Sequence, residues 1–216
     1  KEIALILQDL YKIGDRKYGI KLLNDMNYDI LEGRVISSTP DISSFIIKSV
    51  KLYEPLLAEK LLDKFFEQDI ANKIDNRNFE LSQLSSLLTN LRACDERLSE
   101  KFYSEIENVI IIKKSLKGKV TFRDISTFLS LVYECNRVKT EDIFTNIYAH
   151  DVVHKKIREE TLEKFVHSLN SLHKIRHDYT IKLIKSFVNQ KGMTKEKVLE
   201  KIKSDCKKLW IELESK

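Results

Sequence analysis

The segment 81–107 constrains the fold most, because its apolar residues recur at the spacing of two helices that cannot be stable alone. Five leucines recur at steps of three and four, which places them on one face of a helix: Leu81, Leu84, Leu87, Leu88 and Leu91. Asp95 interrupts this pattern and suits a helix N-cap. A second apolar stripe then follows, at Leu98, Phe102, Tyr103 and Ile106. Each stripe is the nearest cover for the other, so the sequence predicts a helical hairpin.

The same hairpin recurs along the chain. Steps of 41, 41 and 37 residues connect equivalent apolar pairs in four successive first helices: Ile47 and Val50, Leu88 and Leu91, Leu129 and Val132, and Val166 and Leu169. A second helix follows each first helix after a turn that we expect to vary in length. Helix pairs recurring at about forty residues are typical of an α-solenoid, and an ordinary helical bundle is the alternative. We therefore predict an all-α fold, an α-solenoid of stacked helical hairpins.

Composition agrees with a helical, globular chain. Glycine and proline, which interrupt helices, number only five and two in 216 residues. A hydrophobic fraction of 42% beside 33% charged residues is unlike that of a disordered chain. No apolar run approaches the roughly 20 residues of a membrane span, so we expect no membrane insertion. The chain begins at Lys1 rather than Met, which indicates a fragment, a processed form or part of a longer protein.

Turn signals divide the chain into three predicted parts. Pro40 ends the segment Ser37-Ser-Thr-Pro, the clearest break, and Thr194 after Gly192 suits a second helix start. We predict an N-terminal helical hairpin or partial repeat over 1–36, the solenoid repeats over 41–190, and a C-terminal helix over 194–216. This last helix would serve as a cap or as an exit into further structure.

Local patterns also set several helix boundaries. We expect helices over 2–12, 15–26 and 28–36, and one helix over 140–157. The β-branched run 109–112 is expected to prolong the helix before it. Thr121 and Asp124 match a capping box. The final helix is expected to be continuous, with Val198, Ile202, Leu209 and Leu213 on one face.

The three cysteines are far apart, at Cys94, Cys135 and Cys206. With no CxxC pair, free thiols in a reducing compartment are expected. Cys94 and Cys135 are 41 residues apart and occupy equivalent repeat positions, so we interpret both as small core residues.

One short pattern resembles a catalytic motif. In His150-Asp-Val-Val-His154, two histidines four residues apart could hold zinc, as in H-E-x-x-H metalloproteases. Asp151 replaces the catalytic glutamate, however, and no third ligand is evident, so a solvated helix surface is the better interpretation. The sequence also lacks a glycine-rich phosphate loop, a G-x-S-x-G motif and a kinase signature. We expect a non-enzymatic protein with no cofactor and no metal.

Small polar residues recur at two positions of the first helices. The earlier position holds Ser44, Ser85, Ser126 and Glu163, and the next, one helical turn on, holds Lys48, Thr89, Ser130 and His167. In a solenoid, equivalent positions of successive first helices line one continuous surface. Except for Glu163, we predict that these side chains face the bases of RNA, as in arrays that read one base per repeat. Ordinary solvated side chains are the alternative.

Basic clusters lie in or near the turns between helices. The two largest are predicted to contact phosphates: Lys113, Lys114, Lys117, Lys119 and Arg123, then Lys155, Lys156 and Arg158. Lys174 and Arg176 form a third. The net charge of +5 permits a nucleic-acid partner without requiring one. Clusters of this size also serve solubility, which is the alternative.

The residue pattern of the repeats resembles that of a known group of proteins. Leu81-Ser-Gln-Leu-Ser-Ser-Leu-Leu-Thr-Asn-Leu91, followed by Asp95-Glu-Arg-Leu98, gives a leucine-rich first helix and a second helix opening near D-x-x-L. The stretches 124–132 and 162–169 look like the same first helix again. Over about 41–190 the chain is thus similar to the octotricopeptide and heptatricopeptide repeats and to FAST-kinase-like proteins with a RAP domain. No RAP-like segment is visible, so no nuclease role of that domain is carried over.

The resemblance implies a mitochondrial or plastid protein that handles organellar RNA, such as a mitochondrial ribosome-associated subunit or an RNA-stability factor. Its partners would be RNA, with ribosomal RNA as one candidate, and neighbouring proteins of a ribonucleoprotein. The alternative is a protein-binding scaffold of HEAT or TPR type, or the sensor arm of a larger NTPase. Cations converging near Ser44, Ser85 and Ser126 would favour RNA, whereas exposed apolar or acidic patches there would favour a protein partner.

Overall fold

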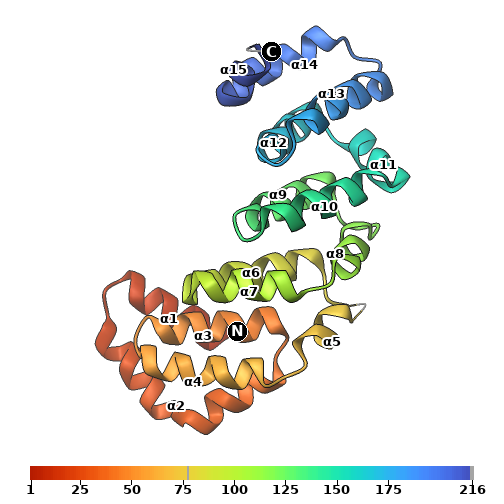
Figure 1. Ribbon diagram of the computed structural model, residues 1–216. Helices are drawn as coiled ribbons and strands as arrows, with labels where there is room; N and C mark the ends of the chain where they lie inside the picture. Colours follow the sequence, from red (N-terminus) through yellow and green to blue (C-terminus); the bar gives the residue numbers. More distant parts are fainter. Residues whose placement is uncertain (77, 215–216) are drawn as a thin grey trace. The chain divides into compact units, whose positions relative to one another are not determined.

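A computed structural model describes residues 1–76 and 78–214 of the chain, apart from the side chains of His177, Lys208, Glu212 and Glu214. All regular secondary structure in these ranges is helical (Figure 1), which confirms the predicted all-α class. The helices form two compact units, Lys1–Glu105 (unit 1) and Ile106–Lys216 (unit 2). Within the described ranges, no helix combines the length and the apolar character needed to cross a bilayer.

Unit 1 is built around α3 and α6, whose apolar faces pack against each other. Leu84, Leu88 and Leu91 of α6 are buried, as their spacing predicts. The N-terminal helices α1 and α2 cover α3 and α4. The helices of unit 1 are α1 (Glu2–Lys12), α2 (Arg16–Ser37), α3 (Pro40–Lys51), α4 (Pro55–Phe66), α5 (Ile70–Asp75), α6 (Leu81–Cys94) and α7 (Glu96–Glu105).

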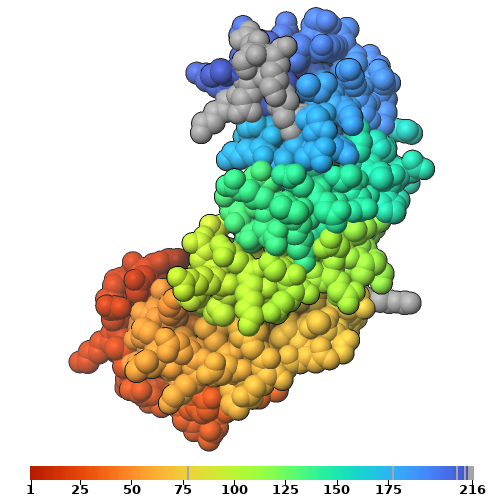
Figure 2. Space-filling model, viewed as in Figure 1, coloured from red at the N-terminus to blue at the C-terminus, as the bar shows by residue number. Residues whose placement is uncertain are grey.

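Unit 2 follows the same plan, with α9 packed on α12 and α12 packed on α14. Figure 2 shows successive colour bands of this unit lying directly against one another, so side chains fill the spaces between its ribbons. The helices of unit 2 are α8 (Asn108–Ser115), α9 (Phe122–Tyr133), α10 (Arg137–Tyr148), α11 (Asp151–Glu159), α12 (Leu162–Leu172), α13 (His177–Lys191), α14 (Lys195–Asp205) and α15 (Lys207–Glu214).

The helix pairs recur more regularly than the sequence suggested. The first helices α3, α6, α9 and α12 begin at residues 40, 81, 122 and 162, which are steps of 41, 41 and 40. The second helices α4, α7, α10 and α13 begin at residues 55, 96, 137 and 177, so each starts 15 residues after its partner. The turn between the two helices of a pair does vary in length, as expected: it has three residues (52–54), one (95), three (134–136) and four (173–176) in the successive pairs. Short third helices, α5, α8 and α11, follow three of the pairs.

The predicted step between the third and fourth first helices was 37 residues, and the observed step from α9 to α12 is 40, so the prediction is wrong by three residues. Thr121 and Thr161 are both N-caps, and their hydroxyls accept hydrogen bonds from the backbone N–H groups of Asp124 and Lys164. These caps are 40 residues apart, and the buried positions of α9 and α12 match at this step. A shift of three residues is almost one helical turn and leaves the apolar stripe in place, so the stripe alone could not reveal the error.

Several helix boundaries differ from the sequence expectations. The capping box of Thr121 and Asp124 is confirmed, as is a break between 15–26 and 28–36, where Asn27 has a φ of 46°. The run 109–112 belongs to a new helix, because Glu107 is extended and α8 starts at Asn108. The expected helix 140–157 is divided, since α10 ends at Tyr148 and His150 caps α11.

The expected single C-terminal helix is divided at Cys206, which lies between α14 and α15 with a φ of −134°. Its buried Sγ lies 3.8 Å from the carbonyl oxygen of Val166 on α12. Ile202 before the break and Leu209 after it are both fully buried.

The compact units divide the chain at Glu105, inside the range 41–190 that the sequence assigned to the repeats. The segment 1–36 does not stand apart, because α1 packs on α3 and α2 packs on α4. The segment 194–216 likewise belongs to unit 2, since α14 packs on α12 and α13.

No disulfide joins the three cysteines, as the sequence predicted. Cys94 and Cys206 are buried, whereas Cys135 is half-buried, so the interpretation as a core residue holds fully only for Cys94 of the equivalent pair. Burial raises the pKa of the Cys94 thiol to about 11, which keeps it protonated near neutral pH. Only the thiolate is a good nucleophile.

We therefore predict that Cys135 is alkylated first when the native protein is treated with iodoacetamide at pH 8. Cys94 and Cys206 should react only after denaturation, because burial protects both sulfurs and disfavours their thiolates. Peptide mapping by mass spectrometry over a time course measures the three rates. Equal rates at Cys94 and Cys135 would contradict the packing described for α6.

Candidate nucleic-acid interface

Ser44 is the predicted base-facing residue of α3, and the structure buries it completely. Its hydroxyl donates to the carbonyl oxygen of Asp41 at 2.9 Å and accepts from Nδ2 of Asn90 at 3.3 Å. The expectation that Ser44 faces solvent is therefore wrong. A serine can lie between two helices because its hydroxyl bonds to its own helix.

The other candidates of unit 1 lie closer to the surface. Thr89 is exposed, and its hydroxyl donates to the carbonyl oxygen of Ser85 at 2.8 Å. Ser85 itself is half-buried. Lys48 is also half-buried, with Nζ 3.5 Å from Oδ1 of Asn90. Thr89 and Lys48 thus remain candidates for contact with a ligand.

In unit 2 the candidates divide in the same way. Ser126 is completely buried, and its hydroxyl donates to the carbonyl oxygen of Arg123 at 2.8 Å, so the expectation that it faces a base is wrong. Ser130 is half-buried and His167 is exposed. These two lie on α9 and α12, which pack together. The later of the two predicted positions is therefore the one that reaches the surface.

The structure adds surface positions that the sequence alignment missed. Ser86 and Thr127, one residue after Ser85 and Ser126, are exposed. With the corrected step of 40 residues, His167 corresponds to Thr127, and exposed Asn170 corresponds to Ser130. The spacing of the leucines could have shown that Ser85 does not lie on the most exposed side of its helix. Ser85 follows Leu84 and precedes Leu88 by three, which puts it at the helix interface.

A cavity of about 390 Å³ lies where α1, α3 and α6 meet in unit 1. Ser85 and Thr89 line it together with Asn90, so the cavity includes two of the predicted residues. Phe45 and Leu5 supply apolar surface, and the Leu5 side chain is 45% exposed. This mixed lining suits contact with apolar as well as polar groups.

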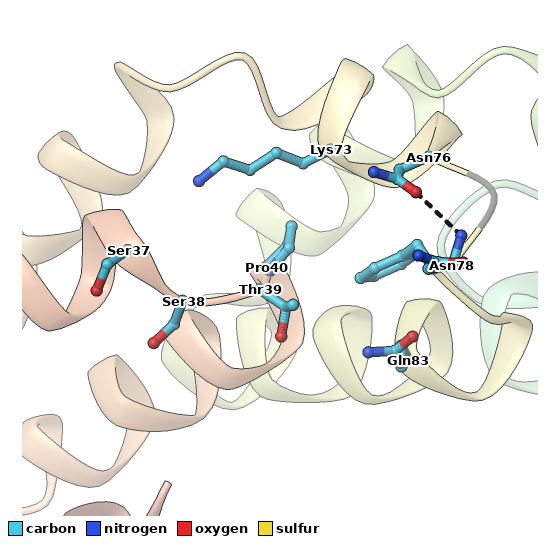
Figure 3. A pocket seen from close by; sticks show the side chains of 9 residues that line it. Ser37, Ser38, Thr39, Pro40, Lys73, Asn76, Asn78 and Gln83 are labelled. Carbon is cyan, nitrogen blue, oxygen red and sulfur yellow. Dashed lines mark hydrogen bonds between the residues drawn. The ribbon is translucent and has the colours of Figure 1, made fainter.

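A second cavity of unit 1, about 370 Å³, lies between the end of α2 and the starts of α3 and α6. Figure 3 shows Thr39, Lys73 and Gln83 around it. Lys73 Nζ donates to the carbonyl oxygen of Ile36 at 3.0 Å, so this ammonium is already engaged. The backbone N–H of Asn78 donates to Oδ1 of Asn76 at 3.0 Å. None of the predicted site residues lines this cavity.

The basic residues of unit 2 separate into exposed and buried groups. Lys114 and Lys156 are only 2% and 6% exposed, so the expectation that they contact phosphates is wrong. Lys117 is half-buried. The exposed members are Lys113, Lys119, Arg123, Lys155 and Arg158.

Lys156 joins the two predicted phosphate clusters. From α11, its Nζ donates to the carbonyl oxygen of Lys117 at 2.6 Å and to that of Val120. The turn 116–121 is thereby tied to α11, which carries Lys155 and Arg158. The turn and α11, about 40 residues apart in the sequence, are thus in direct contact. We call the exposed and half-buried cations of the two clusters the basic edge: Lys113, Lys117, Lys119, Arg123, Lys155 and Arg158.

Burial lowers the pKa of Lys156 below its ordinary value, while Glu159 and Asp124 act in the opposite direction. The charged ammonium is therefore costly to bury, and the carbonyl oxygens that it binds offset that cost. Glu160, also buried, accepts a hydrogen bond from the backbone N–H of Arg123 at 3.4 Å and so places a carboxylate at the start of α9. These contacts fix the backbone beneath the basic edge.

Charge is distributed unequally between the two units. Residues 1–105 contain 15 basic and 18 acidic side chains, a net charge of −3, and residues 106–216 contain 23 and 15, a net charge of +8. The modest total of +5 therefore conceals a strongly basic unit 2. A polyanion would be attracted to unit 2 rather than to unit 1.

The two histidines of the His150–His154 pattern differ in their surroundings: His150 is exposed and His154 is half-buried. His150 is the N-cap of α11, whereas His154 lies inside the helix with Nδ1 3.5 Å from Oγ of Ser186. In the part of the chain that the structure describes, no group of three or more His, Cys, Asp and Glu residues is placed to hold a metal ion.

Comparisons of the chain with protein-family models, with curated proteins and with solved structures find no match.

We predict that Lys156→Ala lowers the free energy of unfolding of unit 2 by about 1–3 kcal/mol, because the carbonyl oxygens of Lys117 and Val120 lose their donor. Lys155→Ala is the matched control: the neighbouring side chain is exposed, and its loss should change the free energy by no more than about 0.5 kcal/mol. Urea denaturation followed by circular dichroism measures both. Equal effects would show that Lys156 does not hold the turn.

Proposed function

We propose that this chain is a non-enzymatic helical-repeat protein that binds single-stranded RNA through unit 2. The observation that carries the proposal is the basic edge, in which Lys156 ties the turn 116–121 to α11. The net charge of +8 on unit 2 supports it, because neutralising phosphates releases counterions and favours binding. The solenoid arrangement of the helix pairs is part of this proposal.

In this mechanism the two surfaces of unit 2 have separate tasks. The ammonium and guanidinium groups of the basic edge contact phosphates and set the register of the strand. Base edges are then read by the polar side chains on the exposed side of α9 and α12: Thr127, Ser130, His167 and Asn170. His167 can also stack on a base through its imidazole ring.

The resemblance of 41–190 to organellar repeat proteins supports an organellar RNA as the ligand. In that setting the protein would belong to a mitochondrial ribonucleoprotein, as a ribosome-associated or RNA-stability component. Ribosomal RNA and neighbouring proteins of the particle are the corresponding partners.

A protein-binding scaffold of HEAT or TPR type, or a sensor arm of a larger NTPase, is the second candidate. It is favoured by the cavity of unit 1, where Leu5, Ile42 and Phe45 supply apolar surface beside Thr89. The net charge of −3 on unit 1 also makes that unit a poor partner for phosphates. A scaffold would use this face for a protein segment rather than for a nucleic acid.

Replacing Lys113, Lys119 and Lys155 with alanine tests the RNA proposal. Each phosphate contact on a single strand contributes about 0.7 to the dependence of log affinity on log salt. The triple variant should therefore lose about 2 units of salt slope if all three residues touch phosphate. Fluorescence anisotropy with a labelled single-stranded RNA of mixed sequence, over a salt series, measures the slope.

The control removes the same charge from unit 1, through Lys17, Lys21 and Lys60, which are also exposed. This variant should keep the wild-type slope. If both variants bind RNA as the wild type does, the basic edge serves solubility only. If the wild type binds no RNA at low salt, the scaffold function replaces the RNA proposal.

A further inference from the structure

The C-terminal part of unit 2 carries an apolar groove that RNA binding does not use. It has a volume of about 200 Å³ and lies among α13, α14 and α15. Ile181 and Ile184 come from α13, Leu199 from α14 and Trp210 from α15. Ile181 is 37% exposed, and Leu199 and Trp210 are half-buried, so these side chains meet solvent where the three helices converge.

The size of the groove limits what can occupy it. Sites for small molecules and cofactors usually measure about 300–1,000 Å³, so a groove of about 200 Å³ is small for such a ligand. It matches one large side chain. Pockets of this kind, with an aromatic wall, typically receive the anchor residue of a protein partner.

The rim of the groove is basic. Lys185 and Lys195 line it and are exposed. Nζ of Lys203 lies 5.4 Å from the centre of the Trp210 ring, which puts another cation beside the apolar floor. The described lining residues include no carboxylate. A partner with acidic residues around its apolar anchor would therefore be favoured, and one with basic residues disfavoured.

We propose that this groove binds an acidic amphipathic helix of a partner protein. The helix would place an apolar anchor between Ile181 and Trp210 and direct carboxylates toward Lys185 and Lys195. An amphipathic helix in an apolar groove is a common form of peptide recognition, with anchors spaced by helical turns. This inference does not depend on RNA binding, because the basic edge and the groove share no residue.

The groove carries its own reporter, because Trp210 is the only tryptophan of the chain. The probe is a helical peptide of about 15 residues, with leucines spaced three and four apart and glutamates on both flanks. Titrating it into the full chain should shift the tryptophan emission to shorter wavelength and saturate. The same peptide with lysines in place of the glutamates should bind at least about tenfold more weakly at low salt.

Two variants with the same change in charge locate the binding site. Ile181→Glu places a carboxylate in the groove and should weaken binding of the glutamate peptide by about tenfold or more. Val138→Glu is the control, because this valine of α10 is 81% exposed and does not line the groove. It should bind as the wild type does. Circular dichroism and thermal denaturation establish that both variants are folded.

Three results would overturn the proposal. The first is an equal response to the two peptides, or no response to the glutamate peptide. The second is unchanged binding by a folded Ile181→Glu variant. The third is occupation of the groove by something else. A shift of the tryptophan emission with protein concentration alone would assign the groove to self-association, and competition between single-stranded RNA and the peptide would assign it to the nucleic acid.

Discussion

Burial of one apolar stripe against the next, between successive first helices, is the interaction on which the rest of the structure depends. α3 packs on α6 in unit 1, and α9 packs on α12 in unit 2. Because each stripe needs a neighbour at a fixed distance along the chain, the helix pairs keep steps of 41, 41 and 40 residues and a constant offset of 15 within a pair. Short third helices follow three of the pairs, and the turn after one of them, 116–121, carries Lys117 and Lys119 of the basic edge.

The tie between Lys156 and the turn 116–121 shows how the fold can serve function. A buried lysine is costly, and here its ammonium binds backbone carbonyl oxygens instead of a carboxylate. The contact joins the turn, which carries Lys117 and Lys119, to α11, which carries Lys155 and Arg158. Unit 1 carries a net charge of −3 and unit 2 a net charge of +8, and in the proposed function phosphate contact therefore falls to unit 2.

The sequence predicted the helices well because leucine spacing is a direct record of which face is buried. It predicted the candidate site less well, for two physical reasons. A stripe repeats with every helical turn, so a register error of three residues preserved the stripe and paired Ser130 with His167 instead of with Asn170. Ser44 and Ser126 also look like surface residues in a sequence, yet each hydroxyl bonds to a carbonyl of its own helix and can be buried. The long-range contacts of Lys156 leave no local pattern that could have revealed them.

Hydrogen–deuterium exchange of the full chain, with and without single-stranded RNA, tests the central claim most directly, because it locates the contact as well as detecting it. The account predicts that RNA slows exchange in the turn 116–121 and in α11 (Asp151–Glu159), with smaller protection on α9 and α12, while α3 and α6 stay unchanged. Protection confined to α1, α3 and α6, around the cavity of unit 1, would contradict it. So would saturating RNA that leaves the turn and α11 unprotected.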